Sequence, residues 1–102
     1  MNRTEHLLTC LAEECAEVQQ SVGKALRFGL DHGYPDRKTT NAQDIAYEIQ
    51  DVIAIVEMLD ECGAVPRSSD LHAIDQKKAK VAALMEFARQ RGTLRDSPEE
   101  HF

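Results

Sequence analysis

The first 28 residues of the chain repeat apolar side chains at alternating steps of three and four positions. These positions are Leu8, Leu11, Cys15, Val18, Val22 and Ala25. Such spacing keeps all of them on one face of an α-helix, which has 3.6 residues per turn. The same spacing recurs in two later segments, and 102 residues contain only five Gly and three Pro. An all-β fold needs turn residues more often, so the sequence predicts an all-α protein.

The first helix is expected to run from Arg3 to about Phe28. Asn2 and Glu5 have the spacing of a capping box, in which two side chains satisfy amides of the first turn. Gly29 is a favourable stop because glycine readily leaves the helical conformation.

A polar loop is expected over residues 29–43. A loop of this length is uncommon in a compact domain and is usually functional. Thr40 or Asn41 is expected to cap the second helix, which continues to about Cys62. The buried face of this helix is predicted to contain Ile45, Ile49, Val52, Val56 and Leu59.

A third helix is expected after a cap at Ser68 or Ser69 and ends near Gly92. Its apolar face is predicted to contain Ile74, Val81, Leu84, Met85 and Ala88. The prediction is therefore one helical domain over residues 1–92 and a C-terminal tail over residues 93–102. Small single cores are marginally stable, so we expect a homodimer or homotetramer in which helices of different subunits form four-helix-type bundles.

Composition narrows the class of protein further. No apolar run approaches the roughly 18 residues needed to span a membrane, and two glutamates in the N-terminal apolar stretch argue against a signal peptide. Three cysteines without a CxxC pair indicate free thiols that fill helix faces in a reduced, cytoplasmic protein. The net charge of −6 argues against a nucleic-acid polymer as partner, because phosphate binding favours a basic protein.

Two pairs of acidic residues lie beside the predicted apolar faces. Helical projection places Glu14 on the shoulder of the first apolar face and Glu17 just beyond it. In the second helix Glu48 projects inside the apolar face, and Asp51 flanks it. Because residues three apart on a helix are neighbours, each helix presents one carboxylate pair at the edge of the packing seam.

Clustered carboxylates repel one another and lose hydration when partly buried, and a divalent cation removes both costs. Oxygen ligands without His or Cys suit Mg²⁺, with Mn²⁺ as a substitute. A ferritin-like di-iron site would need a Glu-x-x-His motif, and no His lies three residues after any of these acids. The alternative interpretation is that they are ordinary surface carboxylates of an acidic chain.

The third helix supplies the opposite charge. Lys77 projects onto the same face as Ile74 and Val81, and Lys80 lies on its shoulder. A cation directed toward an acidic metal cluster is well placed to bind phosphate oxygens. The alternative is that both lysines extend their amines into solvent.

The acidic residues form two motifs, EExxE over residues 13–17 and ExxD over residues 48–51. With these motifs the chain resembles the all-α MazG-like nucleoside triphosphate pyrophosphohydrolases, a family related to dimeric dUTPases and phosphoribosyl-ATP pyrophosphohydrolases. The likeness covers roughly residues 7–92 and includes the segments KALRFGLDHGYP and DVIAIVEML, the Thr40-Asn41 step, and the run from Lys78 to Val81.

The resemblance implies Mg²⁺-dependent hydrolysis of a nucleoside or deoxynucleoside triphosphate to the monophosphate and pyrophosphate. The metal ligands that it implies are Glu14, Glu17, Glu48 and Asp51. Glu13 and Glu17 are candidates to orient the attacking water or accept its proton, and Lys77 and Lys80 are the implied phosphate ligands. Further candidate substrate contacts, for which surface or capping roles are the alternative, are Lys24, Arg27, Lys38 and Asn41.

Other interpretations stay open at the level of sequence. The enzyme could resemble a phosphoribosyl-ATP pyrophosphohydrolase, or the chain could be a non-catalytic helical oligomerisation or regulatory protein. Attack at the α- or the β-phosphorus is not distinguished. Tyr34 in the loop is interpreted either as a base-stacking residue or as cover for the edge of the core, and the four histidines as surface or loop residues.

Overall fold

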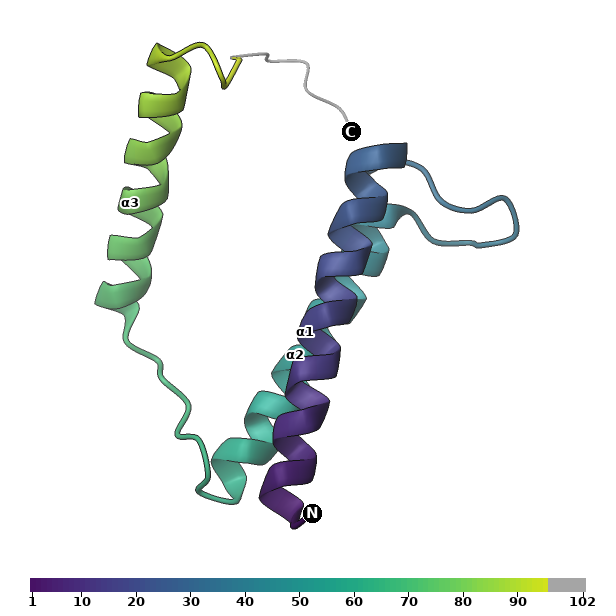
Figure 1. The fold of residues 1–102 in the computed structure, drawn as a ribbon, viewed down its shortest axis with the longest axis vertical. Helices are drawn as coiled ribbons and strands as arrows, with labels where there is room; N and C mark the ends of the chain where they lie inside the picture. The colour runs from purple at the N-terminus through teal and green to yellow at the C-terminus, as the bar shows by residue number, and fades with distance from the viewer. Residues whose placement is uncertain (96–102) are drawn as a thin grey trace. The chain divides into compact units, whose positions relative to one another are not determined.

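The structure is a computed structural model that describes residues 1–95. These residues contain three helices, α1 (Arg3–Phe28), α2 (Asn41–Glu61) and α3 (Leu71–Gln90), and no strand (Figure 1). The prediction of an all-α chain is confirmed. None of the helices in this part of the chain is both long and apolar enough to cross a membrane.

The described residues fall into two compact units, which we treat separately. The first unit, Met1–Arg67, holds α1 and α2, and the second begins at Ser68 and holds α3. The assignment of residues 1–92 to one domain stays a prediction. Of the predicted tail, residues 96–102 lie outside the described part of the chain.

Side-chain caps explain where α1 and α2 begin. The Glu5 amide donates to Asn2 Oδ1 at 2.8 Å. At the start of α2, the Gln43 amide donates to Thr40 Oγ1, and the Thr40 amide donates to Gln43 Oε1, which completes a capping box. Of the two caps predicted for α2, Thr40 is therefore the correct one. Gly29 ends α1 with a φ of 96°, a conformation that favours glycine.

The predicted cap of α3 is wrong. Asp70, rather than Ser68 or Ser69, accepts the Ala73 amide at 3.1 Å. A carboxylate caps a helix as well as a hydroxyl does, and its charge is favourable at the helix N-terminus. The residue preferences for the N-cap position therefore do not distinguish Ser68, Ser69 and Asp70.

Helices α1 and α2 form an antiparallel hairpin (Figure 1). The side chains that lose most solvent exposure follow one row on each helix, at alternating steps of four and three. On α1 this row contains Leu7, Leu11, Glu14, Val18, Ser21 and Ala25. On α2 it contains Asn41, Ile45, Glu48, Val52, Ile55 and Leu59. We call these twelve positions the contact rows; each has one glutamate in the middle.

The predicted buried faces are correct only in part. Leu8, Val22 and Ile49 were assigned to them, yet these side chains are 40–44% exposed, and Cys15 is also exposed. A helix that packs against one partner buries one row, whereas the apolar face in this sequence is two rows wide. The predicted faces therefore combine the two rows. Six of their residues belong to the contact rows, namely Leu11, Val18, Ala25, Ile45, Val52 and Leu59, and the others lie one position later.

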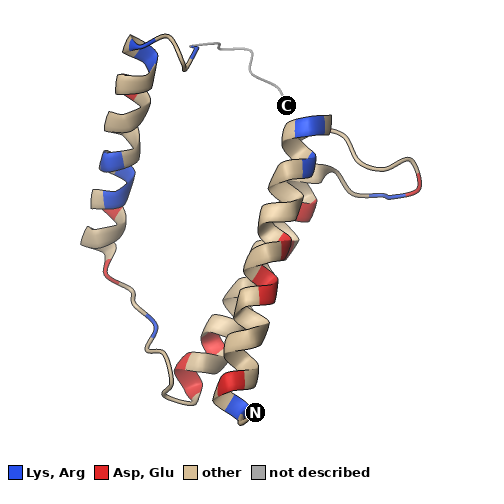
Figure 2. Cartoon of the chain, viewed as in Figure 1, with Lys and Arg blue, Asp and Glu red and all other residues tan. Residues whose placement is uncertain are grey.

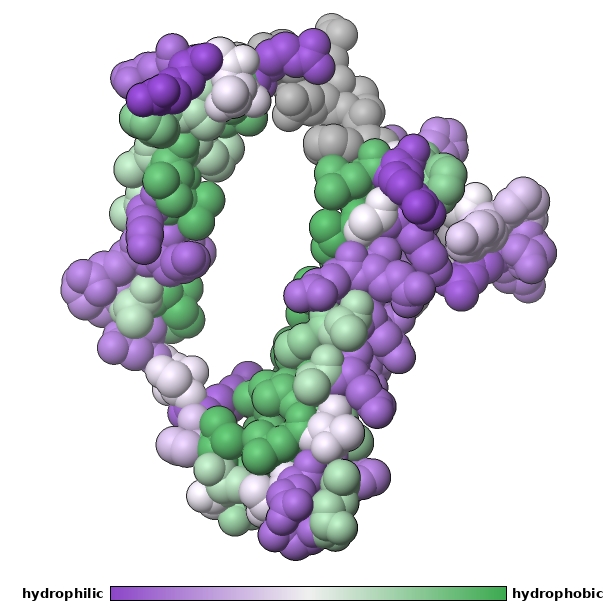
Figure 3. All heavy atoms as spheres, viewed as in Figure 1, coloured by the Kyte–Doolittle hydropathy of each residue, from purple (hydrophilic) through white to green (hydrophobic). Residues whose placement is uncertain are grey.

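The second apolar row follows the contact row by one position on both helices. It contains Leu8, Cys15, Val22 and Leu26 of α1 and Ile49 and Ile53 of α2. Because the two helices are right-handed and antiparallel, this common offset places both rows on one face of the hairpin. Apolar surface is exposed along α1 and α2 in Figure 3. We call these six residues the apolar face.

The connection between α1 and α2 is held by backbone and side-chain hydrogen bonds. The Asn41 amide donates to the His32 carbonyl at 2.6 Å, and Asn41 Nδ2 donates to the Gly29 carbonyl at 2.8 Å. Arg37 forms an ion pair with Asp44 at 3.0 Å. A Cβ atom at Gly33 would overlap the Thr39 carbonyl oxygen, so the closed loop requires glycine at that position.

We therefore expect Gly33→Ala to destabilise the hairpin by about 1–3 kcal/mol, the usual cost of forcing an extra methyl group into a packed site. Gly23→Ala is the matched control, because a Cβ at Gly23 meets no atom within 4 Å. Removing a glycine from the interior of α1 should stabilise the protein by roughly 0.5–1 kcal/mol. Urea denaturation of both variants measures the difference, and equal midpoints would contradict the close approach at Gly33.

Helix α3 is amphipathic, but none of its residues is buried. Its predicted apolar face remains in contact with solvent, with Ile74 46%, Val81 41% and Met85 46% exposed. A single helix of this length is marginally stable in water without a packing partner.

Candidate metal centre

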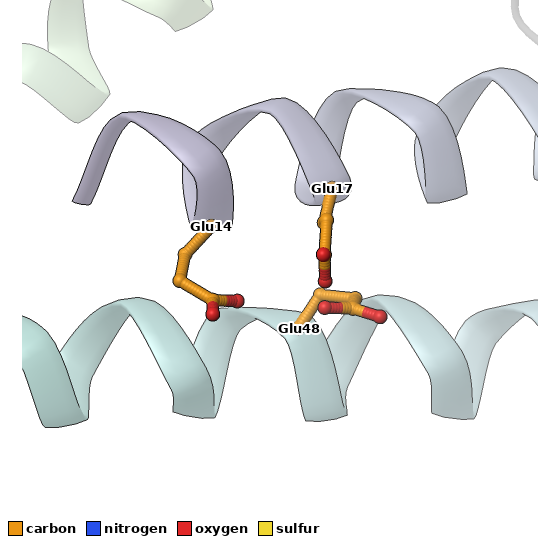
Figure 4. A group of neighbouring side chains, drawn as sticks. All are labelled: Glu14, Glu17 and Glu48. Carbon is orange, nitrogen blue, oxygen red and sulfur yellow. The ribbon is translucent and has the colours of Figure 1, made fainter. Parts of the chain in front are cut away.

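Three glutamates meet between α1 and α2. Glu14 and Glu17 extend from α1 toward Glu48 of α2, as Figure 4 shows. One carboxylate oxygen of each residue lies within 4.8 Å of the other two. Within residues 1–95, this is the one group of three or more His, Cys, Asp and Glu side chains close enough to hold a metal ion.

The positions of these residues follow from the packing of the hairpin. Glu14 and Glu48 occupy the contact rows, where apolar residues stand above and below them. Glu17 lies one turn beyond Glu14 at the edge of the contact, and its side chain is exposed. The prediction that Glu14 stands on the shoulder of the apolar face is therefore corrected, because it lies in the buried row itself.

Two oxygens of this group have no hydrogen-bond partner. Glu14 Oε2 and Glu48 Oε2 are buried, and no donor within the described residues reaches either atom. Buried polar atoms in proteins are nearly always paired, because an unsatisfied one carries the full cost of lost hydration. A hard cation between the helices would satisfy both atoms, and the donor set fits Mg²⁺ or Mn²⁺.

The electrostatic environment of the three glutamates disfavours ionisation of Glu14 and Glu48. Loss of hydration raises the pKa of Glu14, and the charges of Glu17, Asp51 and Glu13 raise it further. The pKa of Glu48 is raised by loss of hydration, by a hydrogen bond with the Glu17 side chain and by neighbouring negative charge. Like charges and partial burial thus both raise the pKa values of Glu14 and Glu48, and a divalent cation bound to the carboxylates would lower them.

The remaining predicted acidic residues surround the three glutamates. Asp51 is exposed and lies outside the closest group, but its charge raises the pKa of both Glu14 and Glu48. Glu13 is exposed and contributes only to the pKa of Glu14. The structure therefore brings three of the four predicted ligands together and leaves Asp51 beside them.

The four residues predicted to contact the substrate lie in different environments. Lys24 is half-buried, with its Nζ 5.4 Å from the centre of the Tyr34 ring. The Arg27 guanidinium lies 4.9 Å from the Phe28 ring, and Lys38 is exposed in the loop. Asn41 is buried and bonds the Gly29 carbonyl, which holds the loop in place. In Figure 2 basic residues lie at the C-terminal end of α1, beyond its acidic residues.

Lys77 and Lys80 belong to α3 in the second unit, and both are exposed. Their assignment as phosphate ligands stays a prediction. Arg37 was not among the residues predicted to contact substrate, yet its guanidinium lies 5.8 Å from the centre of the Tyr34 ring and pairs with Asp44. No spacing rule signals such a contact, because it depends on how the loop closes.

Comparison of this chain with models of protein families, with curated proteins and with solved structures finds no match.

Proposed function

We propose that this protein is a Mg²⁺-dependent nucleoside triphosphate pyrophosphohydrolase of the MazG-like type. It would convert a nucleoside or deoxynucleoside triphosphate and water to the monophosphate and pyrophosphate. The observation that carries the proposal is the group of Glu14, Glu17 and Glu48, with two buried oxygens that lack partners. The choice of reaction rests on the resemblance of the EExxE and ExxD motifs.

Glu14 and Glu48 would hold the cation from opposite helices, with Glu17 as third ligand and Asp51 at the edge of the site. When bound, the cation would neutralise phosphate oxygens and lower the pKa of a coordinated water. Glu14 and Glu48 are partly buried between the helices, each with one carboxylate oxygen inaccessible to solvent, so we assign them the role of metal ligands rather than of proton acceptors.

We assign proton transfer to the exposed carboxylates. Glu17 and Glu13 are accessible on α1, and either could accept the proton of the attacking water. As the new P–O bond forms, the bond to the leaving pyrophosphate breaks, and pyrophosphate takes the electron pair. Lys24 and Arg27 on α1 are candidates to bind phosphate, and Lys77 and Lys80 are proposed on the resemblance alone.

The direct test is pyrophosphate release from a panel of NTPs, dNTPs and phosphoribosyl-ATP, with Mg²⁺ and with excess EDTA. We expect release only in the presence of metal, with the monophosphate as second product. If neither Mg²⁺ nor Mn²⁺ supports release from any member of the panel, the proposal fails and a non-catalytic oligomerisation protein is favoured.

The proposed assembly is a homodimer or homotetramer. Taken by itself, the α1–α2 hairpin has exposed large apolar side chains, and so does α3. Contiguous exposed apolar surface usually marks a contact with another protein surface, and helices of several copies could cover these faces as four-helix-type bundles.

We expect Ile53→Glu to lower the oligomeric mass, because it places a charge in the middle of the apolar face. Ala54→Glu is the matched control, since residue 54 projects away from that face. Light scattering after size-exclusion chromatography should give a multimer for the wild type and the control, and a smaller species for Ile53→Glu. A wild-type chain that is monomeric at micromolar concentration would contradict the proposed assembly.

A further inference from the structure

An open pocket of about 360 Å³ lies at the loop that joins α1 to α2. This volume is within the range of roughly 300–1,000 Å³ that is typical of small-molecule sites. The pocket is lined by Phe28, His32, Gly33, Tyr34, Pro35 and Asn41. Most of the exposed lining is apolar, and two aromatic rings contribute to it.

The hydrogen bonds that fix the conformation of the loop also fix the walls of the pocket. The Asn41 amide bonds the His32 carbonyl, and the Arg37 amide bonds the Tyr34 carbonyl at 2.9 Å. Gly33 allows the chain to approach Thr39 without a side chain between them. The walls are therefore fixed by backbone bonds, which lowers the entropy cost of binding a ligand.

Tyr34 combines an accessible ring with nearby positive charge. The residue is 45% exposed, and the amine of Lys24 and the guanidinium of Arg37 lie over the ring as cation–π partners, 5.4 and 5.8 Å from its centre. Phe28 is 53% exposed. Aromatic faces bind planar bases by stacking, whereas the cations favour the phosphates attached to such a base.

The pocket lies on the same side of the hairpin as the carboxylates. Lys24 follows Glu17 by seven residues, which is nearly two complete turns, so both side chains project in the same direction. The separation along α1 is about 10.5 Å at 1.5 Å per residue. Glu17, Lys24 and the Tyr34 ring therefore follow one another along one face, from the acidic group toward the loop.

We propose that this pocket binds the base of the nucleoside triphosphate whose phosphates reach the Glu14, Glu17 and Glu48 group. This inference rests on the proposed function. Tyr34 stacks on the base, Phe28 forms a second aromatic wall, and Lys24 lies between the base and the metal-bound phosphates. Because stacking accepts any base, differences among nucleotides would come from the polar groups of His32 and Asn41, which also line the pocket.

A binding measurement tests the pocket without relying on turnover. The chain has two tyrosines, Tyr34 and Tyr47, so ring-labelled protein gives two sets of NMR signals, assigned with Tyr47→Phe. Tyr47 is exposed on α2 and does not line the pocket. Titration with each of the four dNTPs, and with the corresponding monophosphates, which the proposed reaction does not consume, should in Mg²⁺ shift the Tyr34 ring signals more than those of Tyr47. If the Tyr34 signals stay unchanged with all four, or only Tyr47 responds, the inference is overturned.

Kinetics provide the second test. Tyr34→Leu keeps apolar volume but removes the ring, and should raise KM for the dNTPs about 5- to 150-fold, the usual cost of losing one stacked base. Tyr34→Phe should restore KM. Inorganic tripolyphosphate has no base, so its inhibition constant should be the same in all three proteins. An equal loss of affinity for tripolyphosphate would show that Tyr34 only supports the loop and would overturn the inference.

The two tests separate this inference from the proposed function. A wild-type protein that releases no pyrophosphate, but whose Tyr34 signals shift with a dNTP, would retain the base pocket and exclude the hydrolase. A protein that hydrolyses dNTPs with unchanged KM after Tyr34→Leu would retain the hydrolase and exclude the pocket.

Discussion

Replacing Glu48 by Gln is expected to abolish metal-dependent pyrophosphate release, with a loss of at least about 100-fold. Groups that only orient a metal ligand cost 10- to 100-fold in affinity or activity when removed, and Glu48 contacts the cation directly in the proposed site. An amide retains the shape of the side chain but lacks the charge that holds Mg²⁺. The measurement is the rate of pyrophosphate release at saturating Mg²⁺.

The matched control is Glu61→Gln, the same chemical change at an exposed position at the end of α2. It should leave the rate unchanged. Without metal, Glu48→Gln should fold as well as the wild type or slightly better, because a partly buried negative charge is removed. The introduced side-chain amide can also donate a hydrogen bond to Glu17. Wild-type turnover by Glu48→Gln would remove this residue from the reaction.

Mg²⁺ is expected to raise the thermal stability of the wild-type protein by roughly 10 °C or more. A ligand at about 100 times its Kd stabilises the folded state by about 2.7 kcal/mol, and about 1 kcal/mol corresponds to several degrees in a chain of this size. Thermal unfolding followed by circular dichroism, with Mg²⁺ and then with EDTA, measures the shift.

The shift should be lost in Glu48→Gln and kept in Glu61→Gln. Equal shifts in both variants would mean that Mg²⁺ binds elsewhere on this acidic chain. The comparison is independent of enzymatic activity, so it reports on the metal centre even when the substrate is unknown.

The same site makes stability depend on pH. Because the pKa values of Glu14 and Glu48 are raised in the folded state, the folded protein holds more protons than the unfolded chain above the ordinary glutamate pKa of 4.5. The free energy of unfolding of the metal-free protein should therefore decrease as pH rises from that value through the raised pKa values. Stabilisation by Mg²⁺ should increase over the same range, since protons compete with the metal.

Denaturant unfolding of the wild type and Glu48→Gln from about pH 4 to about pH 7.5 isolates this effect. The variant should gain stability relative to the wild type as pH rises. A difference that is independent of pH would show that the carboxylate group titrates normally.

Much of the hairpin was predictable from local chemistry. Apolar spacing, Gly29 and the Thr40 cap placed α1 and α2 close to their observed bounds, because these signals act within one or two helical turns. The acidic pairs were visible for the same reason, since residues three apart on a helix are neighbours whatever the fold.

Tertiary structure decided which of two apolar rows is buried, and hence that Glu14 lies inside the contact and Leu8 and Ile49 outside it. It also decided that Glu17 and Glu48 meet, and that Tyr34 lies beside Lys24 and Arg37 around a pocket. The sequence by itself determined three helices and their charges, because helical hydrogen bonds and caps are local. The relative rotation of two helices and the closure of a loop depend on contacts between residues far apart in the chain, and no local pattern specifies them.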